Sequence, residues 1–153
     1  MKTVSEKKAK ALSELVIINN DRYEGYKKAA EETTDSDLKA LFTKFSTQSK
    51  GFSSELRTLI PFTEEAPDRG ETTVSGKFYR AWMDVKSALT AKDRKAILSS
   101  CEFGEDVAKK TYDDVLDKPE DIPSDVLSLI KKQRSELQQG HDTVKALRDS
   151  AKN

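Results

Sequence analysis

The sequence predicts an all-α protein in which four long helices form two helical hairpins, with an additional helical crossover segment between helices two and three. Three observations lead to this prediction. Only six Gly and four Pro occur among 153 residues, so little interrupts long helices. Apolar residues recur at steps of three and four along most of the chain, which is the period of one helix face. The pattern breaks at clusters of Thr, Asp, Pro and Gly, which are residue types that begin and end helices.

The first two helices are predicted over residues 5–32 and 36–59. Their repeating faces are Leu12, Leu15, Val16, Asn19, Tyr23, Tyr26 and Ala30 in the first and Leu38, Leu41, Phe42, Phe45, Ser49, Phe52, Leu56 and Leu59 in the second. Residues 33–36, Thr-Thr-Asp-Ser, separate them and carry short side-chain oxygens that suit the start of a helix. Because this break is short, the two helices should form an antiparallel hairpin.

The connection after this hairpin is predicted in two parts. Residues 61–73 contain two Pro and one Gly among several acids, and should form a loop. Residues 74–89 should form a shorter amphipathic helix, because they are too apolar for a loop. Its apolar positions are Val74, Phe78, Ala81, Trp82, Val85 and Leu89. We expect Trp82 to anchor this segment on the rest of the molecule.

The last two helices are predicted over residues 92–117 and 123–150. Their repeating faces are Ile97, Leu98, Cys101, Ala108, Tyr112, Val115 and Leu116 in the first and Val126, Leu127, Ile130, Leu137, His141, Val144 and Leu147 in the second. Thr90 and Asp93 have the spacing of a capping box, with Asp in the place of Glu, so a helix should begin there. Pro123 suits the first turn of the last helix.

Two helical hairpins joined by a long connector are arranged as in ferritin-like four-helix bundles, where the connector travels the length of the bundle. The helices over residues 36–59 and 92–117 should therefore run parallel. We expect one domain that spans residues 1–153. The residues predicted for the centre of its core are Leu41, Phe45, Phe52, Tyr112, Ile130, Leu137 and Val144.

The charge balance argues against two classes of partner. The chain carries 27 Lys and Arg against 27 Asp and Glu with the signs interspersed, so it offers no field for nucleic acid or for an anionic membrane surface. It has no stretch of about 18 apolar residues and no signal-peptide pattern, so we expect a soluble, cytoplasmic protein. The single Cys101 can form no internal disulfide and should be a small buried side chain.

Four polar segments carry a family resemblance. They are Asn19-Asn20-Asp21 with Glu24-Gly25-Tyr26, then Trp82-Met83-Asp84, then Cys101-Glu102 with Gly104-Glu105-Asp106, and His141-Asp142 with Leu147-Arg148-Asp149. Together they resemble a bacterial family of four-helix, ferritin-like proteins that carries a domain of unknown function. The resemblance covers the chain from about Leu12 to Asp149 and implies the ferritin-like fold, but no particular activity. A more distant resemblance is to the ferritin-like bacterial stress proteins, and this is an analogy of fold.

One level of the predicted bundle is a candidate metal site. Counting residues along each helix from the end near Thr34 brings several carboxylates and one imidazole to the same layer. The candidate ligands are Glu24, Glu102, Glu105 and His141, with Gln48 and Asn20 as outer neighbours. Carboxylates and an imidazole would suit a divalent iron, zinc or manganese ion.

The alternative is a buried hydrogen-bonded network without a metal. A ferritin-like di-metal site needs Glu-x-x-His on two helices, whereas this chain offers Gln48-x-x-Gly51 and Gln138-x-x-His141. The sequence therefore favours a network in which Glu105 and His141 face each other, because unpaired buried charges are costly. The neighbours expected to share it are Asn19, Asn20, Tyr23 and Gln48.

Two hypotheses about function follow. The sequence contains no glycine-rich phosphate loop, no Cys-x-x-Cys pair and no nucleophile elbow, so it identifies no reaction. The first hypothesis is a non-enzymatic helical protein that acts by self-association, as a dimer, or by binding another partner. The second is a ferritin-like metal protein with a reduced ligand set, related to stress, that binds one ion or oxidises iron.

Overall fold

The structure is a computed structural model that describes residues 3–61 and 77–151. Within these residues it contains five helices and no strand, which confirms the all-α prediction. The helices are α1 (Glu6–Glu32), α2 (Ser36–Arg57), α3 (Lys77–Ala91), α4 (Arg94–Leu116) and α5 (Ser124–Ser150). Their described ends lie within about two residues of the predicted ones. The predicted loop over residues 61–73 and the predicted helix start at residue 74 lie outside the described residues, apart from Pro61.

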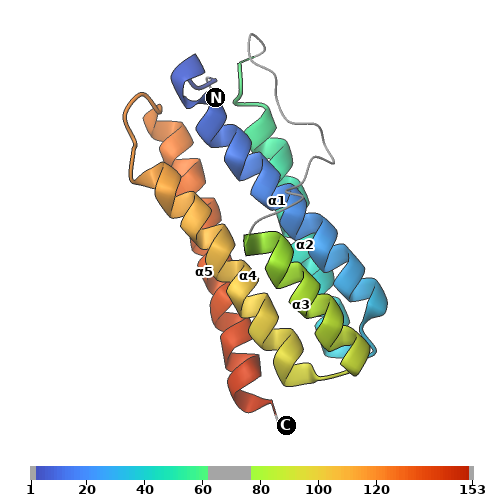
Figure 1. Ribbon diagram of the computed structural model, residues 1–153. Helices are drawn as coiled ribbons and strands as arrows, with labels where there is room; N and C mark the ends of the chain where they lie inside the picture. The colour runs from blue at the N-terminus through green and yellow to red at the C-terminus, as the bar shows by residue number, and fades with distance from the viewer. Residues whose placement is uncertain (1–2, 62–76, 152–153) are drawn as a thin grey trace.

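The helices form two hairpins, α1–α2 and α4–α5, with α3 alongside α4 (Figure 1). Arg94 at the start of α4 pairs with Asp35 and Asp37 at the start of α2, with N–O distances of 3.1 and 2.7 Å. At the opposite end of the molecule, Lys8 of α1 donates to the carbonyl of Lys118, in the α4–α5 turn, over 2.7 Å. These contacts place the starts of α2 and α4 at one end, so the two helices run in the same direction, as the sequence predicts.

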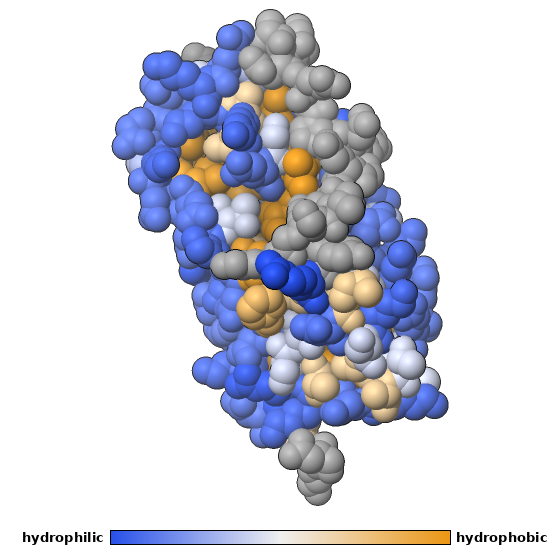
Figure 2. All heavy atoms as spheres, in the orientation of Figure 1, coloured by the Kyte–Doolittle hydropathy of each residue, from blue (hydrophilic) through white to orange (hydrophobic). Residues whose placement is uncertain are grey.

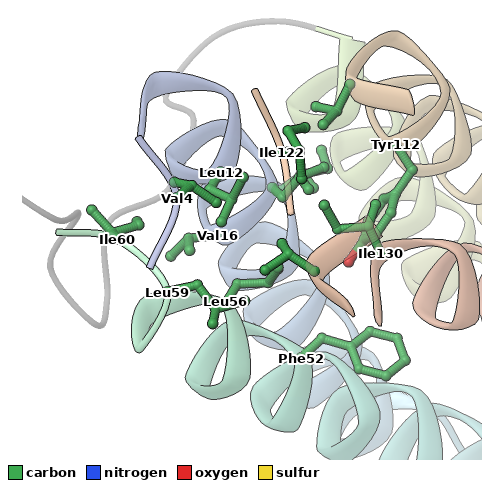
Figure 3. Close-up of a cluster of buried hydrophobic side chains, with 14 of the residues drawn as sticks. Val4, Leu12, Val16, Phe52, Leu56, Leu59, Ile60, Tyr112, Ile122 and Ile130 are labelled. Atoms are coloured by element: carbon green, nitrogen blue, oxygen red, sulfur yellow. The ribbon is translucent and has the colours of Figure 1, made fainter. Parts of the chain in front are cut away.

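The buried side chains form two clusters, one toward each end of the helices. The first cluster takes its side chains from the start of α1, the ends of α2 and α4, and the start of α5 (Figure 3). Ile60 and Ile122, from the chain just beyond α2 and just before α5, close it at that end. Phe52, Tyr112, Ile130 and Leu137, all predicted for the core, are buried in this cluster.

The second cluster lies toward the other end of the helices and includes α3. Phe45 and Val144 are buried in it as predicted, together with Cys101. Leu41 is a correction, because it is only partly buried and packs against the edge of the cluster. Trp82 of α3 packs against the same cluster, which confirms that it anchors the connecting segment. No described helix has the length and apolar composition that a membrane span requires.

The start of α4 differs from the predicted capping box. α3 continues to Ala91, and the helix start moves to Arg94 with Asp93 as its cap. The Asp93 side chain accepts a hydrogen bond from the Ala96 backbone N–H over 3.1 Å. Thr90 instead donates back to the Lys86 carbonyl within α3. Lys92 between the two helices has a φ of 55°, so the chain turns through a left-handed residue before α4 begins.

Candidate functional site

Buried polar side chains separate the two apolar clusters. They interrupt the apolar run at Asn19–Arg22 in α1, at Ser46 and Ser49 in α2 and at Glu105 in α4, and Gly140 stands at the same level of α5. We call this set the polar layer. Its members come from all four long helices, so the polar layer is a shared interior feature and not a local defect of one helix.

The centre of the polar layer is an ion pair between Arg22 of α1 and Glu105 of α4, and both side chains are 0% exposed. Arg22 Nε donates to Glu105 Oε2 over 2.8 Å and Nη2 donates to Oε1 over 2.7 Å, the two-pronged geometry that a guanidinium offers a carboxylate. Burial acts to lower the pKa of Arg22, but the adjacent Glu105 carboxylate outweighs it and the pKa rises. Arg22 therefore stays cationic inside the protein.

The Nη1 group of Arg22 donates hydrogen bonds to oxygen atoms of α2. Nη1 donates to Gln48 Oε1 over 2.9 Å, to Ser49 Oγ over 2.8 Å and to the Phe45 carbonyl over 3.2 Å. The guanidinium also lies 4.8 Å from the centroid of the Phe45 ring and 5.4 Å from that of Tyr26. The charge is thus balanced by one carboxylate and surrounded by oxygen acceptors and ring faces, which offsets the cost of its burial.

A chain of hydrogen bonds extends the polar layer toward α5. Ser49 Oγ donates to Asn19 Oδ1 over 2.9 Å, and Asn19 Nδ2 donates to Tyr112 Oη over 2.8 Å. Tyr112 Oη donates in turn to Gln133 Oε1 over 2.7 Å. Burial raises the pKa of Tyr112, so its hydroxyl remains a donor. The chain links all four long helices through side chains that have no contact with solvent.

Gly140 of α5 makes room for the ion pair. A Cβ at this position would lie 3.1 Å from Glu105 Oε1, 3.2 Å from Phe45 Cε1 and 3.4 Å from Arg22 Nη2. The first two distances are shorter than ordinary van der Waals contact, and the atoms they involve are held by the ion pair and by core packing. The polar layer therefore needs a residue without a side chain on α5.

The predicted partnership of Glu105 and His141 is a correction. Glu105 takes Arg22 as its partner in the interior, whereas His141 lies at the edge of α4 and α5 with 13% of its side chain exposed. Two of the neighbours expected for the network, Asn19 and Gln48, do belong to it, although Gln48 bonds to Arg22. The physical reason is that a guanidinium offers Glu105 two parallel donors and a full charge, which one imidazole cannot.

His141 lies among carboxylates on the outside of the α4–α5 pair. Its Nε2 is 3.0 Å from Asp106 Oδ1 and 3.5 Å from Glu102 Oε2, and its Nδ1 is 3.1 Å from Asp142 Oδ1. The hydrogen bond with His141 holds the pKa of Asp142 below its usual value. Arg148 pairs with Glu102, and Lys109 Nζ lies 3.4 Å from Asp106 Oδ1. These carboxylates are thus already compensated by cations.

The fold brings together only some of the predicted metal ligands. Glu102 and His141 are neighbours, Glu105 is separated from them by its pairing with Arg22, and Asn20 bonds through Oδ1 to Ser53. Glu24 is half-buried on α1, and no hydrogen bond or ion pair joins it to Glu102, Glu105 or His141 within the described residues. No group of three or more His, Cys, Asp and Glu side chains in the described part of the chain is arranged to hold a metal ion.

Cys101 lines a small cavity that is partly open to the surface. The cavity has a volume of about 20 Å³, enough for roughly one water, and Gly25, Tyr26, Trp82 and Gly104 are among the residues that line it. A Cβ on Gly25 would lie 3.2 Å from the Trp82 ring, so the ring packs directly on the α1 backbone. Burial raises the pKa of the Cys101 thiol, which keeps it protonated and unreactive, as predicted for a buried cysteine.

The outer surface carries a second feature, a groove between α3 and α4 of about 570 Å³. Its lining residues are Arg80, Asp84, Phe103, Asp106, Val107 and Lys110. Phe103 of α4 is 48% exposed and Met83 of α3 is 42% exposed, and they are the exposed large apolar side chains of the described residues. Figure 2 shows the side of the molecule on which α3 and α4 face the viewer, where tan and pale atoms interrupt the blue, hydrophilic surface.

Three further residues have positions that helical spacing or residue type could predict. Arg22 lies seven residues after Leu15 and three after Asn19, so it belongs to the buried face of α1. Gly140 stands in the middle of a long helix, where Gly is unfavourable unless packing requires it. Phe103 lies two residues after the buried Cys101, about 200° around the helix, which predicts that it faces outward.

Comparison with protein families gives a match over most of the chain. The family model described as Domain of unknown function (DUF2383) matches residues 7–118, from the first turn of α1 to just beyond the end of α4. The matched residues include Arg22 and Glu105 of the polar layer, Gln48 and Tyr112 that bond to it, and all of the described residues that line the α3–α4 groove. No curated protein matches the chain.

Proposed function

The chain belongs to the DUF2383 family, and we propose that it acts without catalysing a reaction, by self-association. The observation that carries this proposal is the exposure of Phe103 and Met83 on adjacent helices. A single exposed apolar residue on a protein surface needs no explanation. Two large ones on neighbouring helices, one of them lining a groove, within a chain whose charged residues make up 35% of the total, mark a surface that another protein can cover.

The polar layer supports the non-catalytic part of the proposal. Arg22, Glu105, Tyr112 and Asn19 bond to one another in the interior, and none of them reaches solvent. A catalytic group must be able to meet a substrate, and these groups have no opening toward one. Their arrangement suits a structural task, which is to fix how the four long helices lie against one another.

Analytical ultracentrifugation tests self-association directly. The wild-type protein should form a reversible oligomer as its concentration rises through the micromolar range. Phe103→Asp should weaken this association by about 30-fold or more, the equivalent of about 2 kcal/mol for a central apolar contact. The matched control is Ala40→Asp, which adds the same charge at an exposed position of α2. A wild-type protein that remains a monomer across this range would contradict the proposal.

A divalent cation at His141 is the second candidate. What supports it is the meeting of one imidazole with Glu102 and Asp106, which stand one helical turn apart on α4. Binding would require the two carboxylates to leave Arg148 and Lys109, so the candidate depends on a rearrangement of these side chains.

Metal analysis of protein purified without added metal tests this candidate. It predicts stoichiometric iron, zinc or manganese in the wild type and none in His141→Ala. A chelator should then lower the unfolding midpoint of the wild type alone, because a bound ion stabilises the folded state. Metal-free wild type with a midpoint that chelation leaves unchanged removes this candidate.

A further inference from the structure

We infer that the α3–α4 groove is the surface on which a second copy of this chain docks, and that the two copies are related by a two-fold axis. This inference rests on the proposed self-association and adds to it the surface, the partner and the stoichiometry. Most soluble homo-oligomers are closed dimers of this kind, in which one patch meets the same patch of the partner.

The groove combines apolar residues with charges in a repeated pattern. On α3, Arg80 and Asp84 are four residues apart, so they share one face, and the exposed Met83 lies next to Asp84 in the chain. On α4, Phe103 and Val107 share a face with Asp106 and Lys110 by the same spacing.

The charges of the groove are self-complementary. Arg80 and Lys110 are basic, Asp84 and Asp106 are acidic, and the four formal charges sum to zero. A patch with one sign of charge would repel its own copy. Within one copy Lys110 pairs with Asp114 and Asp106 lies beside Lys109, so Arg80 and Asp84, one helical turn apart on α3, are the charges placed to pair across the two-fold axis. The whole chain also has a formal net charge of zero, so no long-range repulsion opposes the approach of two copies.

The apolar residues supply the contact area. The 15 residues of α3 extend roughly 22 Å, and two packed helices present a strip roughly 20 Å wide. Such a strip buries roughly 450 Å² on each copy, or roughly 900 Å² in total, which is below the roughly 1,000 Å² of a stable interface and in the range of a weak, transient one. The dimer should therefore be reversible, with Phe103 as its central anchor.

The other cavities fit a partner less well. The cavity beside Cys101 has room for roughly one water and is too small for a partner to dock in it. A shallow groove between α1 and α2, of about 230 Å³, is lined by Lys27, Lys39, Thr43 and other residues, none of them a large exposed apolar side chain. Only the α3–α4 groove combines exposed apolar residues with balanced charges in the described part of the chain.

Charge complementation between two variants tests the inference. The acidic variant carries Arg80→Glu with Lys110→Glu, and the basic variant carries Asp84→Lys with Asp106→Asn. Asparagine is used at Asp106 because it keeps the size of a residue that also contacts His141. The control carries Lys28→Glu with Lys145→Glu, which changes the net charge as the acidic variant does but at exposed positions outside the groove. Circular dichroism and chemical denaturation establish that each variant is folded.

Each variant alone should dissociate at least tenfold more readily than the wild type, because like charges then face each other across the axis. An equimolar mixture of the two should form a 1:1 heterodimer with an affinity close to that of the wild type, and the control should dimerise normally. Sedimentation equilibrium gives the mass, and native mass spectrometry identifies the heterodimer.

Three results separate the possible failures. If the wild type associates but both groove variants associate equally well, the docking surface lies elsewhere and only this inference is overturned. If the wild type forms an open series of larger species, the two-fold arrangement is wrong. If the wild type is monomeric throughout, the proposed self-association fails together with this inference.

Discussion

At the scale of single residues, Arg22 decides the character of the interior. The sequence predicts a carboxylate–imidazole pair at this level, and a bundle with those groups would have needed a metal ion or a network to balance Glu105. Arg22 supplies a permanent positive charge from α1, directed at both oxygens of Glu105. The guanidinium is thus the cation of the polar layer. Its N–H groups donate to Glu105 of α4 and to Gln48 and Ser49 of α2.

Replacing Arg22 by Met should destabilise the protein by about 3–5 kcal/mol, because it leaves the Glu105 carboxylate buried without a counter-charge. The double variant Arg22→Met with Glu105→Leu should recover much of this loss, since it removes both charges and keeps the volume filled. Urea denaturation measures both. Asp114→Ala is the control for a solvent-exposed ion pair, here with Lys110, and should change stability by only about 0.5 kcal/mol. A loss below about 1 kcal/mol for Arg22→Met would show that water or another group replaces the cation.

At the scale of the helices, propensity and packing conflict at Gly140. Gly weakens a helix interior by about 0.8–1.0 kcal/mol relative to Ala, so its presence in α5 is unfavourable for the isolated helix. Packing reverses the preference, because the ion pair and the Phe45 ring occupy the space that a Cβ would fill. Gly51 of α2 offers the opposite case, since nothing lies within 4 Å of its Cβ position and the residue is exposed.

The two glycines make a matched pair for experiment. Gly51→Ala should stabilise the protein by about 0.5–1 kcal/mol through helix propensity and the reduced entropy of the unfolded chain. Gly140→Ala should destabilise it by about 1–3 kcal/mol, because inserted volume forces the ion pair or the Phe45 ring to shift. Thermal or urea denaturation of the two variants beside the wild type gives both values. Equal effects of the same sign would mean that the polar layer relaxes easily around an added methyl group.

At the scale of the whole molecule, the polar layer divides one interior into two apolar halves. Ion pairs of Arg94 with Asp35 and Asp37 connect the helix starts at one end, and the Lys8–Lys118 hydrogen bond connects the other. The hydrogen bond with Arg94 also lowers the pKa of Asp37. The two halves hold several buried groups whose ionised forms are disfavoured by burial, which makes stability depend on pH in the alkaline range.

The free energy of unfolding should fall as the pH rises above about 9. Burial raises the pKa values of Tyr26, Tyr112 and Cys101 in the folded protein, so these groups keep protons that the unfolded chain releases near pH 9–10. The free energy of unfolding has its full value at a pH below the pKa values that these groups have in the unfolded chain. It decreases as the pH rises past those values, by up to about 1.4 kcal/mol per pH unit for each group.

Urea denaturation at pH 8.5 and pH 10.5 measures this dependence. Tyr112→Phe should be less stable than the wild type at pH 8.5, because Asn19 and Gln133 lose a partner, but it should lose less stability on going to pH 10.5. An identical pH dependence in the wild type and the variant would show that Tyr112 ionises without disturbing the folded state.

The periodicity of the sequence predicted the five helices because it reports which side of each helix avoids water. Ile130 and Leu137 of α5 and Phe52 of α2 each lie on the apolar face of their helix. That face becomes buried whichever neighbouring helix it packs against. Leu41 was the exception, because it lies at the edge of the apolar stripe of α2, where the neighbouring elements decide how much solvent remains. The direction of α4 could also be predicted, since residues 61–89 are too long for a hairpin turn.

The sequence alone determined the all-α class, the places of the helices, the direction in which the second hairpin runs and the presence of polar residues at one interior level. Only the tertiary structure decided which of those polar residues are partners. Helical spacing places Arg22 and Glu105 each on the buried face of its own helix, but their rotation and height relative to each other depend on the packing of α1 against α4. The same packing places His141 at the edge of α5 and requires Gly140 at the centre of its buried face. A side chain at position 140 would need space that the Arg22–Glu105 ion pair and the Phe45 ring already fill.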